Sequence, residues 1–225
     1  MMRRYLTEAE QRALLAAPKG VACPLAQRDY HCLAALMLTG MRITEWSRLT
    51  VSMAKQAMAT GWLVCPPEHC KGKRGNEYLV TEQLRHHLAA LCRLSDELGA
   101  GLLVPAAGQP LVWGRDVAGR AGPLSVRSYE VRLKEWARVA GLDGRISPHW
   151  LRHTLGMNIM RRSRGAHPLK VAQVALGHKC IGSTGVYTQL AREEVEAELR
   201  LVAAGGGRMP KAVARRLALH GGVVS

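Results

Sequence analysis

A helix start lies in the segment Ser147-Pro148-His149-Trp150-Leu151-Arg152-His153-Thr154. Serine followed by proline is typical of a helix N-terminus, because proline at the first helical position has no N–H group to leave unpaired. We therefore expect a helix over about residues 148–163. His149 and Arg152 are three residues apart, so this helix would place both side chains on one face. The planar fork of arginine suits contact with two phosphate oxygens and histidine moves protons, so this face is a candidate phosphate site.

Upstream of this segment, most of the sequence also has helical patterns. Thr7-Glu8-Ala9-Glu10 has the form of a capping box and predicts a helix with Leu14 and Leu15 on its buried face. A second helix is expected from about Pro24 to Thr39, ended by Gly40. Its apolar positions recur at helical spacing: Tyr30, Leu33, Ala34, Met37 and Leu38. The spacing continues through Ile43, Trp46 and Leu49 and returns in Leu84, Leu88, Leu91, Leu94 and Leu98.

Two short apolar runs between these helices have the character of strands. Trp62-Leu63-Val64 and Tyr78-Leu79-Val80 are separated by a basic loop that contains glycine, which predicts a hairpin or part of a small sheet. Residues 99–123 hold six glycines and three prolines, so we expect a loop there, with Leu102-Leu103-Val104 as the one candidate strand.

The last third of the chain returns to helices. Ser125 can cap a helix that carries Tyr129, Leu133, Trp136 and Ala140. Pro168 begins a helix that ends at Gly177, residues 191–203 form a charged amphipathic pattern, and a glycine run at residues 205–207 precedes a basic tail. We therefore predict an α+β, mainly α domain over residues 1–204 with a small antiparallel sheet, followed by a basic C-terminal tail over residues 205–225.

Net charge narrows the class of partner. The chain of 225 residues has 32 Lys and Arg against 17 Asp and Glu, a formal net charge of +15. Such a charge favours a polyanionic partner, because each neutralised phosphate releases condensed counterions. A basic surface that only maintains solubility is the alternative. Because 48% of the residues are hydrophobic, a core can be buried and disorder is excluded as the main state.

The six cysteines do not predict a metal site. Cys65 and Cys70 flank His69 in the expected hairpin, but known zinc sites space their close ligand pairs more tightly and need four ligands. No carboxylate cluster with metal-ligand spacing occurs either, so we expect no metal and no cofactor. The sequence has no signal peptide and no apolar run long enough to span a bilayer. We therefore expect a cytoplasmic protein with free thiols and no membrane partner.

Two further segments carry residues suited to phosphodiester cleavage without a metal. That reaction needs a nucleophile, cations on the non-bridging oxygens and an acid for the leaving oxygen. Arg42 lies just past the second helix in Leu38-Thr39-Gly40-Met41-Arg42-Ile43-Thr44-Glu45. His178 follows Leu176-Gly177, and Tyr187 comes nine residues later. Taken singly, each of these residues is more typical of a surface, helix-end or packing position; their order is the informative feature.

In this order, the three segments resemble the tyrosine recombinase (phage integrase) family, whose signature is Arg, Lys, His-x-x-Arg, His and Tyr. The residues around Arg42 look like the family's TGxRxxE box, and residues 148–154 are similar to its PHxLRHT box. Residues 176–188 are similar to LGHxxxxxTxxYT, including the interval between His178 and Tyr187. The similarity covers roughly residues 5–200 and implies the catalytic-domain fold of this family.

The resemblance implies a role for each matching residue. Tyr187 would be the nucleophile and would leave a 3′-phosphotyrosine and a free 5′-hydroxyl. Arg42 and Arg152 would hold the scissile phosphate, His178 would hydrogen-bond a non-bridging oxygen, and His149 would assist proton transfer at the tyrosine. Since the unperturbed pKa of tyrosine is about 10, neighbouring cations are the physical reason for its deprotonation at neutral pH.

A lysine in the hairpin would be the general acid, and two lysines fit this position. Counting back from Leu79-Val80 in the register of the family's hairpin reaches Lys73, which we favour. Lys71 becomes the candidate if the turn is two residues longer. Glu45 is expected to support Arg42 rather than to react. Further basic residues are expected to contact DNA, the arginines after the 148–163 helix having a solvated loop as their alternative: Lys71, Arg74, Arg161, Arg162 and Arg164.

The resemblance also implies partners and leaves alternatives. Most relatives carry a separate N-terminal core-binding domain, whereas here the catalytic-type sequence begins near residue 5, as in the short recombinases (fimbrial-switch invertases, for example) or in a fragment of a longer protein. The implied partners are double-stranded DNA, three further copies in a homotetramer on two DNA sites, and accessory DNA-binding proteins. Residues 191–203 would dock on a neighbouring copy or pack within the chain. We expect a site-specific recombinase; a type IB topoisomerase-like enzyme and a non-catalytic DNA-binding protein are the alternatives.

Overall fold

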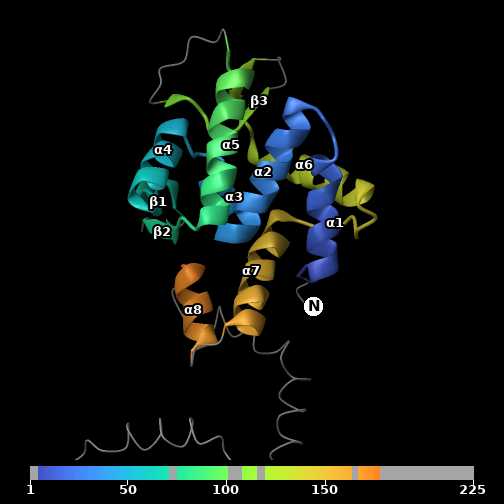
Figure 1. Ribbon diagram of the computed structural model, residues 1–225, viewed down its shortest axis with the longest axis vertical. Helices are drawn as coiled ribbons and strands as arrows, with labels where there is room; N and C mark the ends of the chain where they lie inside the picture. Colours follow the sequence, from blue (N-terminus) through green and yellow to red (C-terminus); the bar gives the residue numbers. More distant parts are fainter. Residues whose placement is uncertain (1–4, 71–74, 101–107, 116–119, 164–166, 178–225) are drawn as a thin grey trace, which may run out of the picture. The chain divides into compact units, whose positions relative to one another are not determined.

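The fold is described by a computed structural model for residues 5–70, 75–100, 108–115, 120–163 and 167–177 (Figure 1). These residues all belong to one compact unit within residues 1–184. In this part of the chain helices dominate, and the strands form two small antiparallel pairs. The predicted class, mainly α with a small antiparallel sheet, is confirmed.

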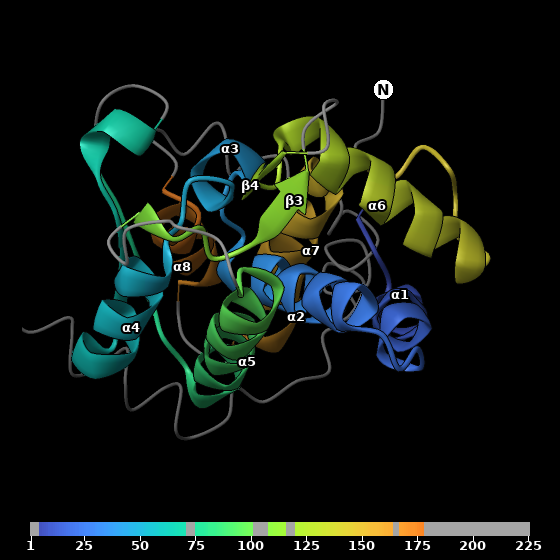
Figure 2. The same ribbon diagram turned by 90° about the horizontal axis from the view of Figure 1, so that it is seen from above.

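Helix α2 (Pro24–Thr39) lies at the centre of the unit and has the predicted bounds. It ends at Gly40, whose φ of 59° is in the left-handed region that glycine adopts without strain. Helices α1 (Glu8–Lys19), α5 (Glu82–Leu98) and α7 (Pro148–Arg162) pack around it (Figure 2). Burial therefore extends around most of α2, whereas the sequence pattern predicted one apolar face. Small residues such as Cys32, Ala34 and Ala35 let several helices approach it closely.

A buried carboxylate ties α2 to helix α6 (Val126–Val139). Asp29 is buried and accepts hydrogen bonds from Arg28 on its own helix and from Arg132 Nε at 2.6 Å and Trp136 Nε1 at 2.8 Å on α6. Arg28 in turn donates to the carbonyl of Trp113 at 2.7 Å. The buried charge of Asp29 is thus compensated by its neighbour Arg28 and by Arg132, 103 residues later, as buried charges require.

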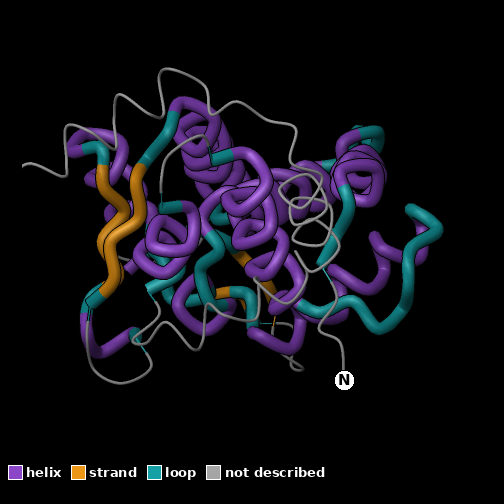
Figure 3. Tube along the Cα trace, turned by 90° about the horizontal axis from the view of Figure 1, so that it is seen from below, coloured by secondary structure: helices purple, strands orange, loops and turns teal. Residues whose placement is uncertain are grey.

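The predicted hairpin is present, its two strands are seen in Figure 3, and its first strand packs against helix α4 (Val51–Thr60). Strand β1 (Trp62–Cys65) pairs antiparallel with β2 (Asn76–Leu79), and a short 3₁₀ turn, η1 (Pro67–His69), follows β1. The helical spacing through Leu49 does not form one long helix. Instead α3 (Ile43–Trp46) is a single turn, and α4 (Val51–Thr60) starts anew where the Thr50 hydroxyl accepts a hydrogen bond from Met53 N.

A second antiparallel pair lies in the region that was predicted to be a loop. It consists of β3 (Trp113–Arg115) and β4 (Ala121–Pro123), and Thr50 forms an isolated bridge with Pro110 nearby. Strands of three residues that contain glycine and proline have no readable period, so their pairing depends on tertiary contacts. The candidate strand at 102–104 lies outside the described residues.

The remaining helix signals are confirmed. Thr7 and Glu10 form the predicted capping box of α1, and the Ser125 hydroxyl accepts a hydrogen bond from Ser128 N at the start of α6. Helix α7 begins at Pro148, and helix α8 (Pro168–Ala175) is followed by Gly177. The amphipathic segment at 191–203, the predicted domain end at residue 204 and the basic tail lie outside the described residues. In the described part of the chain, no helix has the length and apolar character that a membrane crossing requires.

One hydrophobic core joins these elements. Its largest fully buried side chain is Trp46, which follows Arg42 by one helical turn and donates from Nε1 to Cys32 Sγ at 3.1 Å. Leu14 of α1, Leu88 of α5 and Leu133 of α6 belong to the same cluster. The core therefore fixes the segment that carries Arg42 against α2, and this positions the candidate site.

Candidate active site

Arg152 is the side chain at which the three sequence boxes meet. It is 3% exposed, and its Nη1 donates to the Gly40 carbonyl at 2.6 Å while Nη2 donates to the Leu176 carbonyl. Gly40 precedes Arg42 by two residues, and Leu176 precedes His178 by two residues. One guanidinium therefore connects the backbone beside the first box to the backbone beside the third.

Two glycines in the left-handed conformation allow this close approach. Gly40 has a φ of 59°, and a Cβ added there would lie 2.8 Å from Leu176 Cδ2 and 2.9 Å from Leu155 Cδ2. Gly177 has a φ of 58°, and its added Cβ would lie 2.8 Å from Asn76 Oδ1 of β2. Side chains at either position would strain the backbone and push neighbouring elements apart. The glycines in the TGxRxxE and LGH boxes thus have a packing reason.

Arg42 is held at the start of α3 by a buried carboxylate. Its Nη1 donates to Glu45 Oε1 at 2.9 Å, while the arginine side chain is 31% exposed and that of Glu45 is fully buried. Glu45 also accepts from Tyr78 OH at 2.8 Å and from Asn76 Nδ2 at 3.3 Å. The predicted supporting contact between Glu45 and Arg42 is confirmed, and the hairpin supplies the other donors to this carboxylate.

Tyr78 is suited to donate a hydrogen bond and not to act as a nucleophile. Burial, followed by the neighbouring negative charge of Glu45, raises the pKa of its hydroxyl far above the ordinary value. The hydroxyl therefore keeps its proton and binds Glu45 at neutral pH. From the sequence, Tyr78 was assigned to a predicted strand, and Asn76 was missed. The one signal for both was Glu45, because a buried carboxylate needs several donors.

His149 lies on the exposed side of α7, one helical turn before Arg152. Its ring meets that of buried His153 edge to face, with centroids 4.4 Å apart and an interplanar angle of 88°. This contact holds the His149 ring against the helix turn that follows it. His149 and Arg152 thus lie three residues apart on one helix as predicted, and Arg152 contacts the carbonyl of Gly40, two residues before Arg42.

We call the meeting point of Gly40, Arg42, Glu45, Arg152 and Leu176 the junction. Its side chains favour the binding of an anion. Arg42 pairs with the buried carboxylate of Glu45, and Arg152 adds a second guanidinium that donates to the neutral Gly40 and Leu176 carbonyls, so these three side chains carry more positive than negative charge. The Arg42 side chain is partly exposed and can still offer N–H groups to a ligand oxygen. A phosphate placed at Arg42 would meet a cation whose position is fixed by hydrogen bonds to the protein.

Other predicted site residues are placed elsewhere or not described. Arg161 and Arg162 lie nine and ten residues beyond Arg152 on α7, which corresponds to about 14 Å of helix. Arg161 Nη2 donates to Tyr5 OH at 2.7 Å, and Arg162 Nη2 contacts Glu8 Oε1 at 2.6 Å. The structure does not bring these two arginines to the junction. The remaining predicted positions lie outside the described residues: Lys71, Lys73, Arg74, Arg164, His178 and Tyr187.

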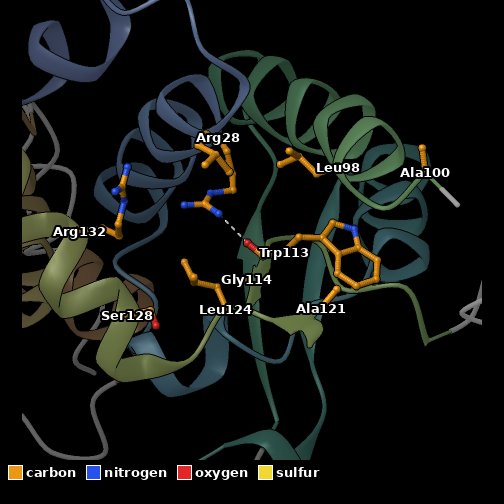
Figure 4. Close-up of a pocket in the computed structure, with 10 residues that line it drawn as sticks. Arg28, Leu98, Ala100, Trp113, Gly114, Ala121, Leu124, Ser128 and Arg132 are labelled. Carbon is orange, nitrogen blue, oxygen red and sulfur yellow. Dashed lines mark hydrogen bonds between the residues drawn. The ribbon is translucent and has the colours of Figure 1, made fainter. Parts of the chain in front are cut away.

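A pocket of about 700 Å³ lies apart from this junction, and none of the predicted site residues lines it. Figure 4 shows its wall, to which Arg28, Trp113 and Arg132 contribute. Both arginines already pair with Asp29, and Arg28 also donates to the Trp113 carbonyl (dashed line in Figure 4). The polar groups that these two arginines bring to the pocket are thus already paired within the protein.

Comparison with known proteins gives one consistent result. A model of the phage integrase family matches residues 4–194. The tyrosine recombinase XerD of Xanthomonas campestris pv. campestris is 32% identical over 197 residues, which are 86% of this chain and 57% of that protein. The chain thus spans less than two thirds of the length of this relative.

Two solved structures share the fold. The crystal structure of the XerA recombinase matches with a TM-score of 0.66 and 19% identity, over 93% of this chain and 68% of the other. The XerH site-specific recombinase, bound to palindromic difH substrate in a post-cleavage complex, matches with a TM-score of 0.63 and 18% identity, over 88% of this chain and 53% of the other. With three boxes joined at Arg152 and a family model that matches most of its length, this chain belongs to the phage integrase family of tyrosine recombinases.

Proposed function

We propose that this chain cleaves and rejoins double-stranded DNA at specific sites through a covalent 3′-phosphotyrosyl intermediate at Tyr187. The observation that carries the proposal is the double hydrogen bond of Arg152 to the Gly40 and Leu176 carbonyls, since it unites the segments that hold Arg42 and His178. Membership of the family and the net charge of +15 support DNA as the substrate. A relative of the same fold is named as bound to its difH substrate.

Each residue has a defined role in this reaction. The Tyr187 oxygen attacks phosphorus, the bond from phosphorus to the 5′ oxygen breaks, and His149 takes the tyrosine proton. Arg42, Arg152 and His178 neutralise the non-bridging oxygens, and Lys73 gives its proton to the leaving 5′ oxygen. Attack by a 5′-hydroxyl on the phosphotyrosine reverses these transfers and restores the free enzyme.

Covalent trapping tests the nucleophile. The full chain is mixed with a library of nicked duplexes of random sequence, in which the short cleaved strand diffuses away, and complexes that survive denaturation are sequenced. We expect a covalent complex with the unchanged chain and with Tyr5→Phe, which loses a hydroxyl elsewhere, and none with Tyr187→Phe. Absence of any covalent complex, or equal trapping with Tyr187→Phe, would refute catalysis. Relaxation of supercoils without joining of two different captured sites would instead identify a topoisomerase-like enzyme.

The general acid can be assigned separately. A substrate with sulfur in place of the bridging 5′ oxygen has a leaving group that needs little protonation. We expect Lys73→Ala to lose cleavage of the oxygen substrate and to recover it with the sulfur substrate, while Lys71→Ala loses affinity in both. Recovery by Lys71→Ala alone would transfer the role to Lys71.

We further propose that the active form is a homotetramer on two DNA sites in the cytoplasm, with residues 191–203 docked on a neighbouring copy and accessory DNA-binding proteins joining some sites. Mass measurements on the captured DNA test the assembly. Deletion of the residues after 190 should leave a folded protein that binds DNA without forming the tetramer. A normal tetramer from that truncation would refute the docking role.

A further inference from the structure

Three histidines from two helices gather at a place that the proposed reaction does not use. His31 lies on α2, and His86 and His87 are adjacent on α5. One ring nitrogen from each residue can be chosen so that all three atoms lie within 4.8 Å of one another. His86 is exposed, and the other two side chains are half-buried. The cluster is therefore open to solvent on one side and packed against the protein on the other.

Two of the ring nitrogens in this cluster are nearly as far apart as two ligands of one metal ion. His31 Nδ1 lies 2.9 Å from His87 Nδ1. Imidazole nitrogens bind zinc at about 2.0–2.1 Å, and two ligands of a tetrahedral ion at that distance are about 3.3 Å apart. A shift of a few tenths of an ångström would thus open the required space between these two atoms. The His86 ring, with its centroid 5.7 Å from that of His31, can supply the third ligand.

Tyr30 holds two of these rings in place. Its ring packs edge to face against His31, with centroids 4.7 Å apart, and against His87 at 5.6 Å. Such contacts restrict the rotamers of the histidines before any ion binds, which lowers the entropic cost of binding.

We propose that His31, His86 and His87 form a binding site for a divalent transition-metal ion of the zinc class, bridging α2 and α5. Imidazole ligands suit zinc, cobalt, nickel and copper ions, and the exposed side leaves a fourth position for water. Lys19 and Arg93 face the cluster, and their charge opposes a cation. The site should therefore bind with micromolar affinity, weaker than a site completed by carboxylates.

The hairpin offers a competing site that the test must separate. Cys65 Sγ and Cys70 Sγ lie 3.3 Å apart, and thiolates also bind zinc. Cobalt distinguishes the two sets, because a thiolate ligand adds an intense sulfur-to-metal charge-transfer band in the near ultraviolet, whereas nitrogen and oxygen ligands give visible bands alone. Co²⁺ is therefore the first probe, and Zn²⁺ follows by displacement.

The experiment titrates Co²⁺ into the full chain after treatment with a chelator. We expect visible bands that saturate near one ion per chain without the sulfur band, displacement by Zn²⁺, and a rise of roughly 5 °C in Tm at a hundredfold excess of Zn²⁺ over Kd. His87→Gln and His86→Gln should each weaken Co²⁺ binding at least tenfold. His69→Gln, which changes a histidine in the hairpin, should bind as the unchanged chain does.

Two results would overturn the proposal. One is binding that persists at full affinity in His86→Gln, a change at an exposed position that leaves the helix intact. The other is a sulfur band that disappears in Cys70→Ser, which would assign the ion to the hairpin. Failure of the recombinase activity would leave both readouts unchanged, because the metal titration needs neither cleavage by Tyr187 nor DNA.

Discussion

The two ends of α7 carry arginines in opposite surroundings. Arg152, in the second turn, is buried and donates to two backbone carbonyls from distant segments. Arg161 and Arg162, in the last turn, are exposed and contact Tyr5 and Glu8 at the surface. A buried guanidinium cannot replace its partners with water, whereas an exposed pair exchanges freely and contributes little stability. One end of the helix thus fixes the backbone of the candidate site, and the other keeps its charge available for another partner.

The largest expected effect comes from removing the buried arginine. Arg152→Ala leaves the Gly40 and Leu176 carbonyls without their donor and should lower the free energy of unfolding by about 3 kcal/mol. Urea denaturation measures this loss, and covalent trapping should fall below detection. A variant with unchanged stability would show that the junction does not hold the segments together. Arg161→Ala is the matched control at the exposed end and should unfold as the unchanged chain does.

Gly40 tests how tightly the junction is packed. Gly40→Ala adds the strain of a left-handed alanine, about 1 kcal/mol, to the contact with Leu176 and Leu155, for a total loss of about 2–3 kcal/mol. Gly61→Ala is the control, since Gly61 has a φ of 82° and nothing within 4 Å of an added Cβ. The difference between the losses of unfolding free energy in the two variants gives the cost of the steric contact at Gly40. Equal losses would contradict the close approach of α2 to α7 and Leu176.

A smaller effect is expected from the hydroxyl that binds Glu45. Tyr78→Phe removes one donor from a buried carboxylate and should lower the free energy of unfolding by about 1–2 kcal/mol. Because Glu45 holds Arg42, the rate of covalent trapping should also fall, roughly tenfold. Tyr5→Phe makes the same change at a tyrosine that contacts Arg161 at the exposed end of α7, and it should alter neither quantity. If both variants behave alike, Tyr78 has only a packing role.

The smallest effect on stability is expected at Arg162, and there DNA binding is the sharper measurement. Arg162→Ala removes an exposed ion pair and should leave the unfolding curve unchanged. If Arg162 contacts a phosphate, the slope of log affinity against log salt should decrease in magnitude by about 0.9. Arg127→Ala on α6, which also removes an exposed pair, is the control. An unchanged slope would assign Arg162 to the surface contact with Glu8 alone.

Much of the helical fold could be predicted from the sequence, because its signals are local. The bounds of α2, the capping box of α1 and the start of α7 depend on residues within one or two turns of each other. The β3–β4 pair and the bridge between Thr50 and Pro110 could not be predicted, since their stability comes from contacts between distant segments.

In the candidate site, too, the features that could be predicted are local in sequence, and those that could not depend on distant segments. The order of the three boxes, around Arg42, Arg152 and Tyr187, identified the family, but the partners of Arg152 are backbone carbonyls, which leave no trace in residue identity. Asn76 and the role of Tyr78 were missed because their partner, Glu45, lies more than thirty residues away. The histidine cluster was missed for the same reason, although the adjacent pair His86-His87 was a visible hint.

The buried polar contacts of α2 also determine when, during synthesis, this helix can complete its packing. Asp29 binds Arg132 and Trp136, which lie 103 and 107 residues later in the sequence. The carbonyl of Gly40 accepts a hydrogen bond from Arg152, 112 residues later. During synthesis, α2 therefore leaves the ribosome early, but its polar groups gain their partners only after α6 and α7 have been synthesised. Until α6 and α7 emerge, its carboxylate and its last turn stay hydrated, and the apolar surface beside them has no cover. Nascent chains that stall before residue 152 should need protection from chaperones, and refolding should be slow for a protein so rich in helices.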